Sequence, residues 1–439
     1  MTQQTKKISI VVTILIIIAL VIAFNDPRAQ PQQVEHRTAE VEPQRVNITS
    51  IEGPISQVAA GYGTSFALQP TGELWAWGLY FDGEGQYNTD AQLMHIPGGA
   101  AYVSAFGHVE HDMRAPLQSH AMTISTDGAL WGFGANFFGQ LGVGMYRSIG
   151  YPVRVMDGVT HVATGNAKTA AITSAGGLYM WGLNQSGELG FSPTIAVGSI
   201  YPAWLRDDAV SIAISHEHVL ITKADNSLWG WGLYSGLGIG VTYPTIPVFR
   251  RDFLGRPITE DLTAIPDPIT HKIMDNVAAA AVGGGHSLAL TTGGVLYAWG
   301  RNLEGQVGSG ISNHEPYPHR LPYPVMIKEG IASIITGTHN SAAITYDGEL
   351  YVWGLNNSGQ IGNGTNINQP TPVKIMDNVV QLAISNGIDS VHMLAITADG
   401  SLWGWGCNRF GQLGIAPDVV YMSNVPVMIR ASSHTTVTH

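Results

Sequence analysis

Charge is what this chain has least of. Only 12% of its 439 residues are charged, about half of the usual ~25%. Disordered chains are rich in charge and poor in large apolar residues, whereas 45% of this chain is hydrophobic, so most of it must fold. The formal net charge is −11, and no block of like charge interrupts the sequence. That balance argues against a nucleic-acid-binding protein, which needs a basic surface.

Cysteine and catalytic motifs are scarce as well. Cys407 is the single cysteine, which excludes an internal disulfide and a cysteine-based metal site. No G-x-S-x-G elbow, P-loop or H-E-x-x-H motif occurs, so nothing supports a hydrolase and no cofactor is expected. Glycine, by contrast, is abundant, with 53 residues and no three-residue period. Collagen is therefore excluded, and an internal repeat becomes the first thing to look for.

The N-terminus differs in composition from the rest. Lys6 and Lys7 precede an uncharged apolar run, residues 8–24, whose helix would span about 25 Å, slightly less than a ~30 Å hydrocarbon core. We expect a single-pass membrane anchor with residues 1–7 in the cytoplasm and the remainder outside. The alternatives are a signal segment cleaved after Ala23, giving a secreted protein, and a buried core helix. Residues 25–45 contain three prolines and predict a flexible linker.

One pattern recurs seven times in the remaining chain: Leu, aromatic, any residue, aromatic, Gly. The copies end at spacings of 48 to 68 residues, at Gly78, Gly134, Gly182, Gly232, Gly300, Gly354 and Gly406. Ten of the eleven tryptophans lie inside these copies, and Trp204 is the exception. So regular a pattern identifies a repeat protein.

Each copy predicts a β-hairpin. The leucine and the two aromatic residues alternate along one strand, so they occupy opposite faces, and both faces are expected to be covered. Six residues before the final glycine stands another glycine, or Asn226 in the fourth copy. These residue types accept positive φ, which predicts a tight turn after a short apolar strand. With outer segments such as YPVRVMDGV, each repeat supplies four short strands, the content of one propeller blade.

Seven such blades account for residues 46–430, leaving residues 431–439 as a tail. The sequence therefore predicts an all-β, seven-bladed β-propeller preceded by one N-terminal transmembrane or signal helix. A propeller ring must close, and residues 424–429 supply a last outer-strand motif. We expect this motif to complete the first blade beside residues 46–60.

The segment after the final glycine completes the pattern, as in ANFFGQLGVG, LNNSGQIGNG and CNRFGQLGIA. Together with G-x-x-H before the hairpin, the repeat resembles the regulator of chromosome condensation repeat over most of the chain. The resemblance implies a seven-bladed propeller. It also implies varied functions, because members include a nucleotide exchange factor for a nuclear GTPase that binds chromatin, ubiquitin-ligase modules, light sensors and secreted bacterial proteins. Most use a propeller face to hold another protein. Copies one and four lack the asparagine of the connecting loop, so their loops should differ.

Several polar residues are candidates for chemistry. The position fourteen residues before each final glycine holds, in chain order, Thr64, His120, Lys168, His218, His286, Asn340 and His392. One such residue per blade cannot gather around a metal, so we expect a structural role in which each residue ties a turn of its repeat by hydrogen bonds. Two local clusters could bind zinc at the surface if three or four ligands converge, with solvated loops as the alternative. They are His216-Glu217-His218 and the segment from His108 to Asp112.

Two insertions exceed the basic repeat, residues 95–116 and 249–271. Loops that leave a rigid scaffold often carry binding sites. Arg250, Arg251 and Phe253 offer the cationic and aromatic side chains that are enriched in binding hot spots. They are the candidate protein-binding residues, against the alternative of a surface loop without function.

The sequence favours a non-enzymatic, extracytoplasmic propeller, tethered to the membrane through residues 8–24, that binds a protein or a cell-envelope ligand. A guanine nucleotide exchange factor is one alternative, although it needs a cytosolic propeller. A cell-envelope hydrolase or lyase with a site in the propeller cleft is the other.

Overall fold

The computed structural model describes most of the chain after residue 47. The described residues are 48, 51–81, 87–88, 91–107, 119–185, 187–191, 198–216, 218–232, 236–239, 270–310, 320–387 and 390–431. Contacts divide the chain after Glu42, and all described residues belong to the second unit, residues 43–439. No helix among the described residues is long and apolar enough to cross a membrane. The predicted anchor, residues 8–24, and the linker lie outside them.

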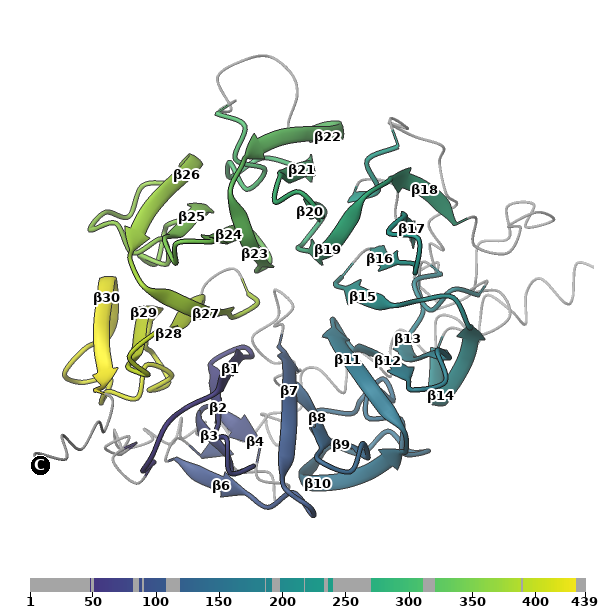
Figure 1. Ribbon diagram of the computed structural model, residues 1–439. Helices are drawn as coiled ribbons and strands as arrows, with labels where there is room; N and C mark the ends of the chain where they lie inside the picture. Colours follow the sequence, from purple (N-terminus) through teal and green to yellow (C-terminus); the bar gives the residue numbers. More distant parts are fainter. Residues whose placement is uncertain are drawn as a thin grey trace, which may run out of the picture. The chain divides into compact units, whose positions relative to one another are not determined.

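Seven four-stranded antiparallel sheets form a ring, as the repeat count predicts (Figure 1). Blade 1 contains β1 (Gln57–Ala60), β2 (Thr64–Leu68), β3 (Leu74–Gly78) and β6 (Gln92–Met94). Blade 2 contains β7 (Ala100–Phe106), β8 (His120–Ser125), β9 (Leu130–Gly134) and β10 (Ile149–Met156). Blade 3 contains β11 (Val159–Gly165), β12 (Lys168–Thr173), β13 (Leu178–Leu183) and β14 (Gly198–Arg206).

The remaining blades repeat this order from the inside outward. Blade 4 contains β15 (Ser211–Ile214), β16 (His218–Thr222), β17 (Leu228–Gly232) and β18 (His271–Met274). Blade 5 contains β19 (Val277–Val282), β20 (His286–Thr291), β21 (Leu296–Arg301) and β22 (Arg320–Lys328). Blade 6 contains β23 (Ile331–Thr336), β24 (Asn340–Thr345), β25 (Leu350–Gly354) and β26 (Gln369–Met376). Blade 7 contains β27 (Val379–Ile384), β28 (His392–Thr397), β29 (Leu402–Cys407) and β30 (Met422–Arg430).

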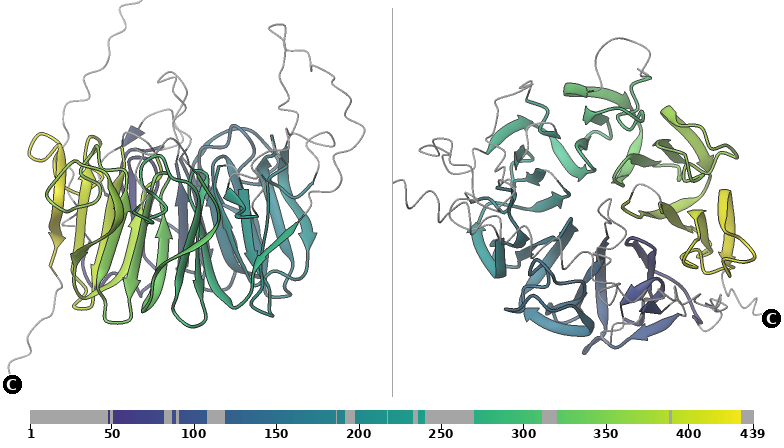
Figure 2. Two further views of the ribbon diagram at one scale, coloured as in Figure 1. Left: turned by 90° about the horizontal axis from the view of Figure 1, so that it is seen from above. Right: turned by 180° about the vertical axis from the view of Figure 1, so that it is seen from behind.

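The predicted hairpin is the second and third strand of every blade. In blade 5 its register joins His286 to Gly300 and Leu290 to Leu296. The turn residue has positive φ in all seven copies, including Asn226 at 61°. One end of the propeller therefore carries these hairpin turns, and the other carries the loops that follow the repeat glycine. We call them the hairpin face and the loop face; Figure 2 shows the ring from the side.

Both faces of the third strand are covered, as predicted, with the first aromatic residue of each copy half-buried. All seven leucines of the motif have no exposed surface, and six tryptophans that precede the final glycine are at most 1% exposed. Each tryptophan packs between its own blade and the preceding one, so the apolar clusters lie at the seams between blades. One cluster combines Trp353 with Leu288 and Val307 of the preceding blade. The core is therefore a series of seven seams around the ring.

The predicted ring closure is wrong. The last outer strand, β30, pairs with β29 of its own blade, with Trp403 opposite Met428. The outer strand of blade 1 is the short β6, with Trp75 opposite Leu93. In this propeller each outer strand pairs with the hairpin that precedes it in the sequence. The last outer strand therefore pairs with the last hairpin and not with the first. The ring closes by packing of blade 1 against blade 7, where Ile48 and Ile51 join a cluster with Leu394 and Leu402.

The loop asparagine explains the conserved shape of the loops within this chain. Asn136 Oδ1 accepts a hydrogen bond from the Leu141 amide, and Nδ2 donates hydrogen bonds to the carbonyls of Met145 and Arg147. Asn184, Asn302, Asn356 and Asn408 accept the equivalent amide. Copy one, which lacks this residue, differs as expected, because a two-stranded hairpin follows its glycine, β4 (Tyr80–Phe81) and β5 (Tyr87–Asn88).

Candidate protein-binding site

The residues fourteen before each repeat glycine lie one per blade; the four histidines and Lys168 join neighbouring blades, whereas Thr64 and Asn340 bond within their own blade. The His392 Nε2 lies 2.8 Å from Ser65 Oγ of the next blade, and that hydroxyl donates to the Gln412 carbonyl at 2.7 Å. Since the hydroxyl hydrogen is used on the carbonyl, the histidine must donate from Nε2. Trp77 Nε1 donates to the same Gln412 carbonyl at 3.0 Å. The prediction of a structural hydrogen bond is confirmed, but the bond crosses a seam and does not tie a turn.

We call this chain of hydrogen bonds, from the histidine through the hydroxyl to the loop carbonyl, the relay. The residue types at its first two positions are paired from seam to seam. Histidine faces a hydroxyl at four seams: His120 with Thr169, His218 with Ser287, His286 with Ser341 and His392 with Ser65. At the other three seams the next blade offers Ala121, Val219 or Met393 at the hydroxyl position. There the first residue is Thr64, Lys168 or Asn340. The two positions therefore vary together, as expected for a buried hydrogen bond.

Burial keeps the relay histidines neutral. It lowers the pKa of His120 to about 4 and that of His218, His286 and His392 to about 3. These side chains are spaced around the ring and serve its assembly. They do not form a site.

Blade 3 replaces the histidine by a buried ion pair. Lys168 Nζ lies 3.2 Å from Glu188 Oε1, with the two side chains 1% and 6% exposed. Lys168 also donates to the His216 carbonyl of blade 4 at 3.0 Å. Glu188 occupies the loop position that holds a buried glutamine in blades 2, 5, 6 and 7. Both members of the pair have thus changed together, and the pair seals the seam between blades 3 and 4.

The structure describes only part of the two candidate zinc sites. His218 is buried and its Nε2 is used on Ser287, so it cannot turn towards His216. No group of three or more potential metal ligands occurs among the described residues. The segment from His108 to Asp112 lies outside them, as do Glu217 and the candidate binding residues Arg250, Arg251 and Phe253.

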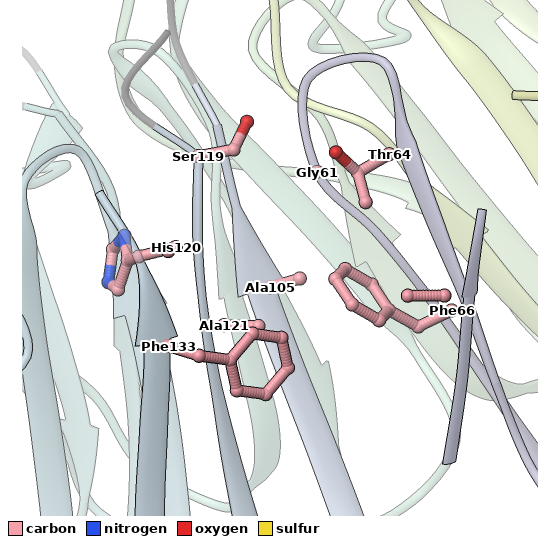
Figure 3. Close-up of a pocket in the computed structure, with 10 residues that line it drawn as sticks. Gly61, Thr64, Phe66, Ala105, Ser119, His120, Ala121 and Phe133 are labelled. Atoms are coloured by element: carbon pink, nitrogen blue, oxygen red, sulfur yellow. The ribbon is translucent and has the colours of Figure 1, made fainter. Parts of the chain in front are cut away.

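A small cavity marks the seam between blades 1 and 2 (Figure 3). Phe66 and Phe133 face each other across it with ring centroids 6.0 Å apart, and Ala105 and Ala121 complete the apolar lining. His120 points away from this seam (Figure 3). The cavity has a volume of about 20 Å³ and admits little more than one water molecule, so it is too small to be a substrate pocket.

The most conspicuous surface feature lies where blades 2 and 3 meet on the loop face and outer rim. We call it the aromatic patch, and it consists of Phe137, Met145, Tyr146, Tyr201 and Trp204. Their exposed fractions are 44%, 46%, 61%, 61% and 59%. Large apolar residues gathered in this way mark interaction surfaces, whereas scattered ones need no explanation.

Local packing brings these residues together. The blade 2 loop rests on the start of β14, where the Gly144 amide donates to the Ile200 carbonyl at 2.9 Å. Gly139 lies against Ile200, and any side chain at Gly144 would collide with the Tyr201 ring. The loop therefore delivers Met145 and Tyr146 next to Tyr201. An irregularity in the pairing of β13 and β14 turns Trp204, three residues further on, to the same exposed side.

Blade 6 provides an internal comparison for the patch. It forms the same loop, with Asn356 in place of Asn136, and the same outer strand. Counted from that asparagine, its loop has Asn357, Thr365 and Asn366 where blade 2 has Phe137, Met145 and Tyr146. Its outer strand has Thr371 and Lys374 where blade 3 has Tyr201 and Trp204. Blade 6 therefore folds without aromatic residues at these positions, whereas an exposed tyrosine recurs at the Tyr201 position in blades 2 and 5, as Tyr151 and Tyr323.

Charged groups border the patch on its hairpin-face side. The Trp204 Nε1 donates to Asp207 at 2.8 Å, which fixes the indole on the surface. Beside it, hydrogen bonds from Arg206, supported by Lys223, lower the pKa of Asp208 to about 2. The patch is therefore bordered on this side by the ionised Asp208 carboxylate and its cationic partners, and charged groups at the edge of an apolar area are typical of a protein-binding surface.

Sequence reasoning missed this patch because the outer strands look alike in every copy. One signal was available: Trp204 is the single tryptophan outside the repeat motif. The tryptophans of the repeat motif pack between neighbouring blades, so Trp204, which lies outside the motif, has no equivalent core position.

Comparisons with known proteins agree with the repeat. Sequence profiles of the regulator of chromosome condensation (RCC1) repeat match residues 127–172, 293–344, 347–388 and 399–439, and, for a second form, 277–306 and 331–360. The ultraviolet-B receptor UVR8 of Arabidopsis thaliana is 29% identical over 389 residues, covering 86% of this chain and 82% of UVR8. The mitochondrial RCC1 domain-containing protein RUG3 of the same plant is 31% identical over 325 residues, covering 69% and 66%.

A solved structure shows the same architecture. Yeast RCC1 (Prp20), determined with Kap60 bound, superposes with a TM-score of 0.64 at 20% identity, covering 89% of this chain and 86% of that chain. At this identity the likeness concerns the fold.

Proposed function

This chain belongs to the family of regulator of chromosome condensation (RCC1) repeat proteins, and on that premise we propose that it is a non-enzymatic protein-binding module. Propellers of this type act in binding and regulation: one relative is named as a receptor, and yeast RCC1 has been solved with Kap60 bound. The observation that carries the proposal is the aromatic patch, because the blade 2 loop and the blade 3 outer strand together expose five large apolar side chains in one place.

The chemistry of the patch suits a protein partner. Tyrosine and tryptophan combine a large apolar surface with a polar end and lose little conformational entropy on binding, so they dominate interface hot spots. Tyr146, Tyr201 and Trp204 are each about three-fifths exposed. The partner should present a complementary apolar surface, of a protein or of a protein component of the cell envelope.

We also propose the setting in which the propeller works. The uncharged run of residues 8–24 follows two lysines, a pattern typical of an anchor whose N-terminus stays in the cytoplasm. The propeller would then lie outside the cytoplasm, joined to the membrane by residues 25–45. Protease added to intact spheroplasts should remove the propeller. Protection until lysis would contradict this topology and favour a cytosolic exchange factor.

The binding test compares two double variants of residues 43–439, which contain all seven sheets. Tyr201→Ser with Trp204→Ser removes the centre of the patch, while Thr371→Ser with Lys374→Ala changes the equivalent positions of blade 6. Both pairs are exposed, so both variants should melt like the parent. Proteins captured from the cell-surface fraction by the parent and by the blade 6 variant should be lost with the patch variant. Equal capture by the parent, the patch variant and the blade 6 variant would contradict the proposal.

A further inference from the structure

A second apolar surface lies on the far side of the ring from the aromatic patch. We call it the blade 7 edge, and it consists of Ile367, Val419, Tyr421, Met422, Val425 and Met428. Val419 is 73% exposed and Ile367 69%, and the others are also exposed. Met422, Val425 and Met428 follow one another along the outward side of β30. Tyr421 and Val419 directly precede that strand, and Asn366 next to Ile367 contacts Asn424.

The fold does not require these residues to be apolar. Counted from the proline of the outer strand, Val425 and Met428 correspond to Thr371 and Lys374 in blade 6. A further strand would pair poorly with β30, because Pro426 in its middle has no N–H to donate. Whatever covers the blade 7 edge therefore contacts side chains and does not extend the sheet.

The chain enters the propeller at this same blade. Ile48 is the first described residue, and it lies against Gly414 and Ile429 of blade 7. The 47 preceding residues, with the apolar run 8–24 among them, therefore join the propeller at the seam between blades 7 and 1. A tether that starts here joins the ring where blade 7, which carries this edge, meets blade 1.

We propose that the blade 7 edge rests on the surface of the lipid bilayer. The inference depends on the proposed tether. Apolar residues and a tyrosine are the side chains that enter the headgroup region of a membrane. Asp418 and Arg430 flank the edge with one charge of each sign, so contact with lipid should depend on apolar area and little on anionic lipid. Since β30 and β14 lie on opposite sides of the ring, the aromatic patch then faces away from the membrane (Figure 1).

Flotation with lipid vesicles tests the contact without the anchor. Residues 43–439 should float with vesicles of phosphatidylcholine, and with a 7:3 mixture of phosphatidylcholine and phosphatidylglycerol to within a factor of two. Val419→Asp with Val425→Asp should lower the bound fraction at least fivefold. Thr371→Asp, on the equivalent strand of blade 6, and the patch variant Tyr201→Ser with Trp204→Ser should float like the parent. Melting temperatures establish that all variants fold.

The full chain gives an independent measurement. Cys407 is buried, so a nitroxide reagent will label an introduced cysteine selectively. In proteoliposomes, a label at Val425→Cys should be relaxed more by lipid-soluble oxygen than by a water-soluble nickel chelate, and a label at Thr371→Cys should show the reverse.

The outcomes separate this inference from the proposed function. No flotation together with a water-exposed label at Val425→Cys overturns the membrane contact, while capture of a protein by the patch is unaffected. Loss of a captured protein from the Val419→Asp, Val425→Asp variant, without vesicle binding by the parent, makes the edge a protein interface and also overturns it. Release of the full chain from membranes by alkaline carbonate refutes the tether itself.

Discussion

Single residues decide how each seam of this propeller is sealed. Lys168 and Glu188 stand where other blades carry histidine and glutamine, and the two positions have changed together. A buried ion pair contributes little net stability, because desolvation opposes the attraction, but removing one partner strands the other charge. The pair should therefore be replaceable as a unit and intolerant of single changes.

The first prediction follows from that asymmetry. Glu188→Gln should lower the free energy of unfolding by about 3 kcal/mol, because the Lys168 ammonium stays buried without its counter-charge. Lys168→His combined with Glu188→Gln should recover at least half of the loss. Urea denaturation of the two variants and the parent measures both values. A Glu188→Gln variant as stable as the parent would show that Lys168 is satisfied by the His216 carbonyl alone.

The second prediction concerns pH. The four relay histidines are neutral in the folded protein, with pKa values lowered by burial to about 3 or 4, against about 6.5 when unfolded. The unfolded chain therefore binds more protons between pH 6.5 and 4. Stability should be fully present above pH 6.5 and should fall as the pH drops through that window, by about 1.4 kcal/mol per pH unit for each histidine.

A single substitution isolates one histidine. His286→Asn introduces the residue that blade 6 uses at this position, Asn340. It should reduce the slope of unfolding free energy between pH 5 and 6 by one proton equivalent, whatever its effect at pH 7. An unchanged slope would mean that His286 is protonated in the folded protein.

At the scale of elements, the repeat hairpin was predictable in detail. Leucine, tryptophan and glycine at fixed spacing determine the face, the burial and the turn, and the structure has all three as expected. The sequence did not determine which blade each outer strand joins. A motif such as that of residues 424–429 reads alike whether it joins the blade before it or the blade after it. Only the pairing of β30 with β29 decides the matter.

The third prediction tests the turn. Gly348 has φ +79°, and a Cβ placed there would lie 3.3 Å from Asn378 Cα. Gly348→Val should destabilise by more than ~1 kcal/mol, because a β-branched residue is strained at positive φ. Gly293→Val in blade 5 is the matched control, since its Cβ would meet nothing closer than 3.9 Å. Equal melting temperatures of the two variants would contradict this account of the turn.

For the whole molecule, the sequence supports the ring and its blade count but not its surface. Interior positions repeat because every seam solves the same packing problem, so one copy predicts the next. The aromatic patch and the blade 7 edge depend on outer-strand and loop residues that vary between copies, and the grouping of Tyr201 or Val425 with their neighbours follows only when the ring is assembled. Trp204 was the visible exception in the sequence, yet the approach of Met145 and Tyr146 to Tyr201 on the same strand depends on a loop from another blade.

Assembly of the ring also distinguishes its seams from one another. The closing seam between blades 7 and 1 has the complete relay, with Ser65, His392 and Trp77, together with the Gln381 side chain accepting the Val58 amide at 2.8 Å. The seam between blades 1 and 2 has Thr64 and Ala121 at the relay positions, and Phe133 where other blades have tryptophan. It also contains the small cavity. The weakest seam is thus expected between blades 1 and 2 and not between blades 7 and 1, where the ring closes.

The fourth prediction installs the missing relay at that seam. Ala121→Ser alone buries a hydroxyl without a histidine donor and should lower the free energy of unfolding by about 1 kcal/mol. Thr64→His supplies the donor, so the double variant should be more stable than the sum of the single effects by about 1 kcal/mol. The native relay offers the matched cycle, in which Ser65→Ala and His392→Ala should show coupling of the same sign. Urea denaturation measures both cycles. Additive effects at the first seam, with coupling at the second, would mean that blades 1 and 2 are held too far apart for a relay, so that their separation and not their residue types sets the weakness.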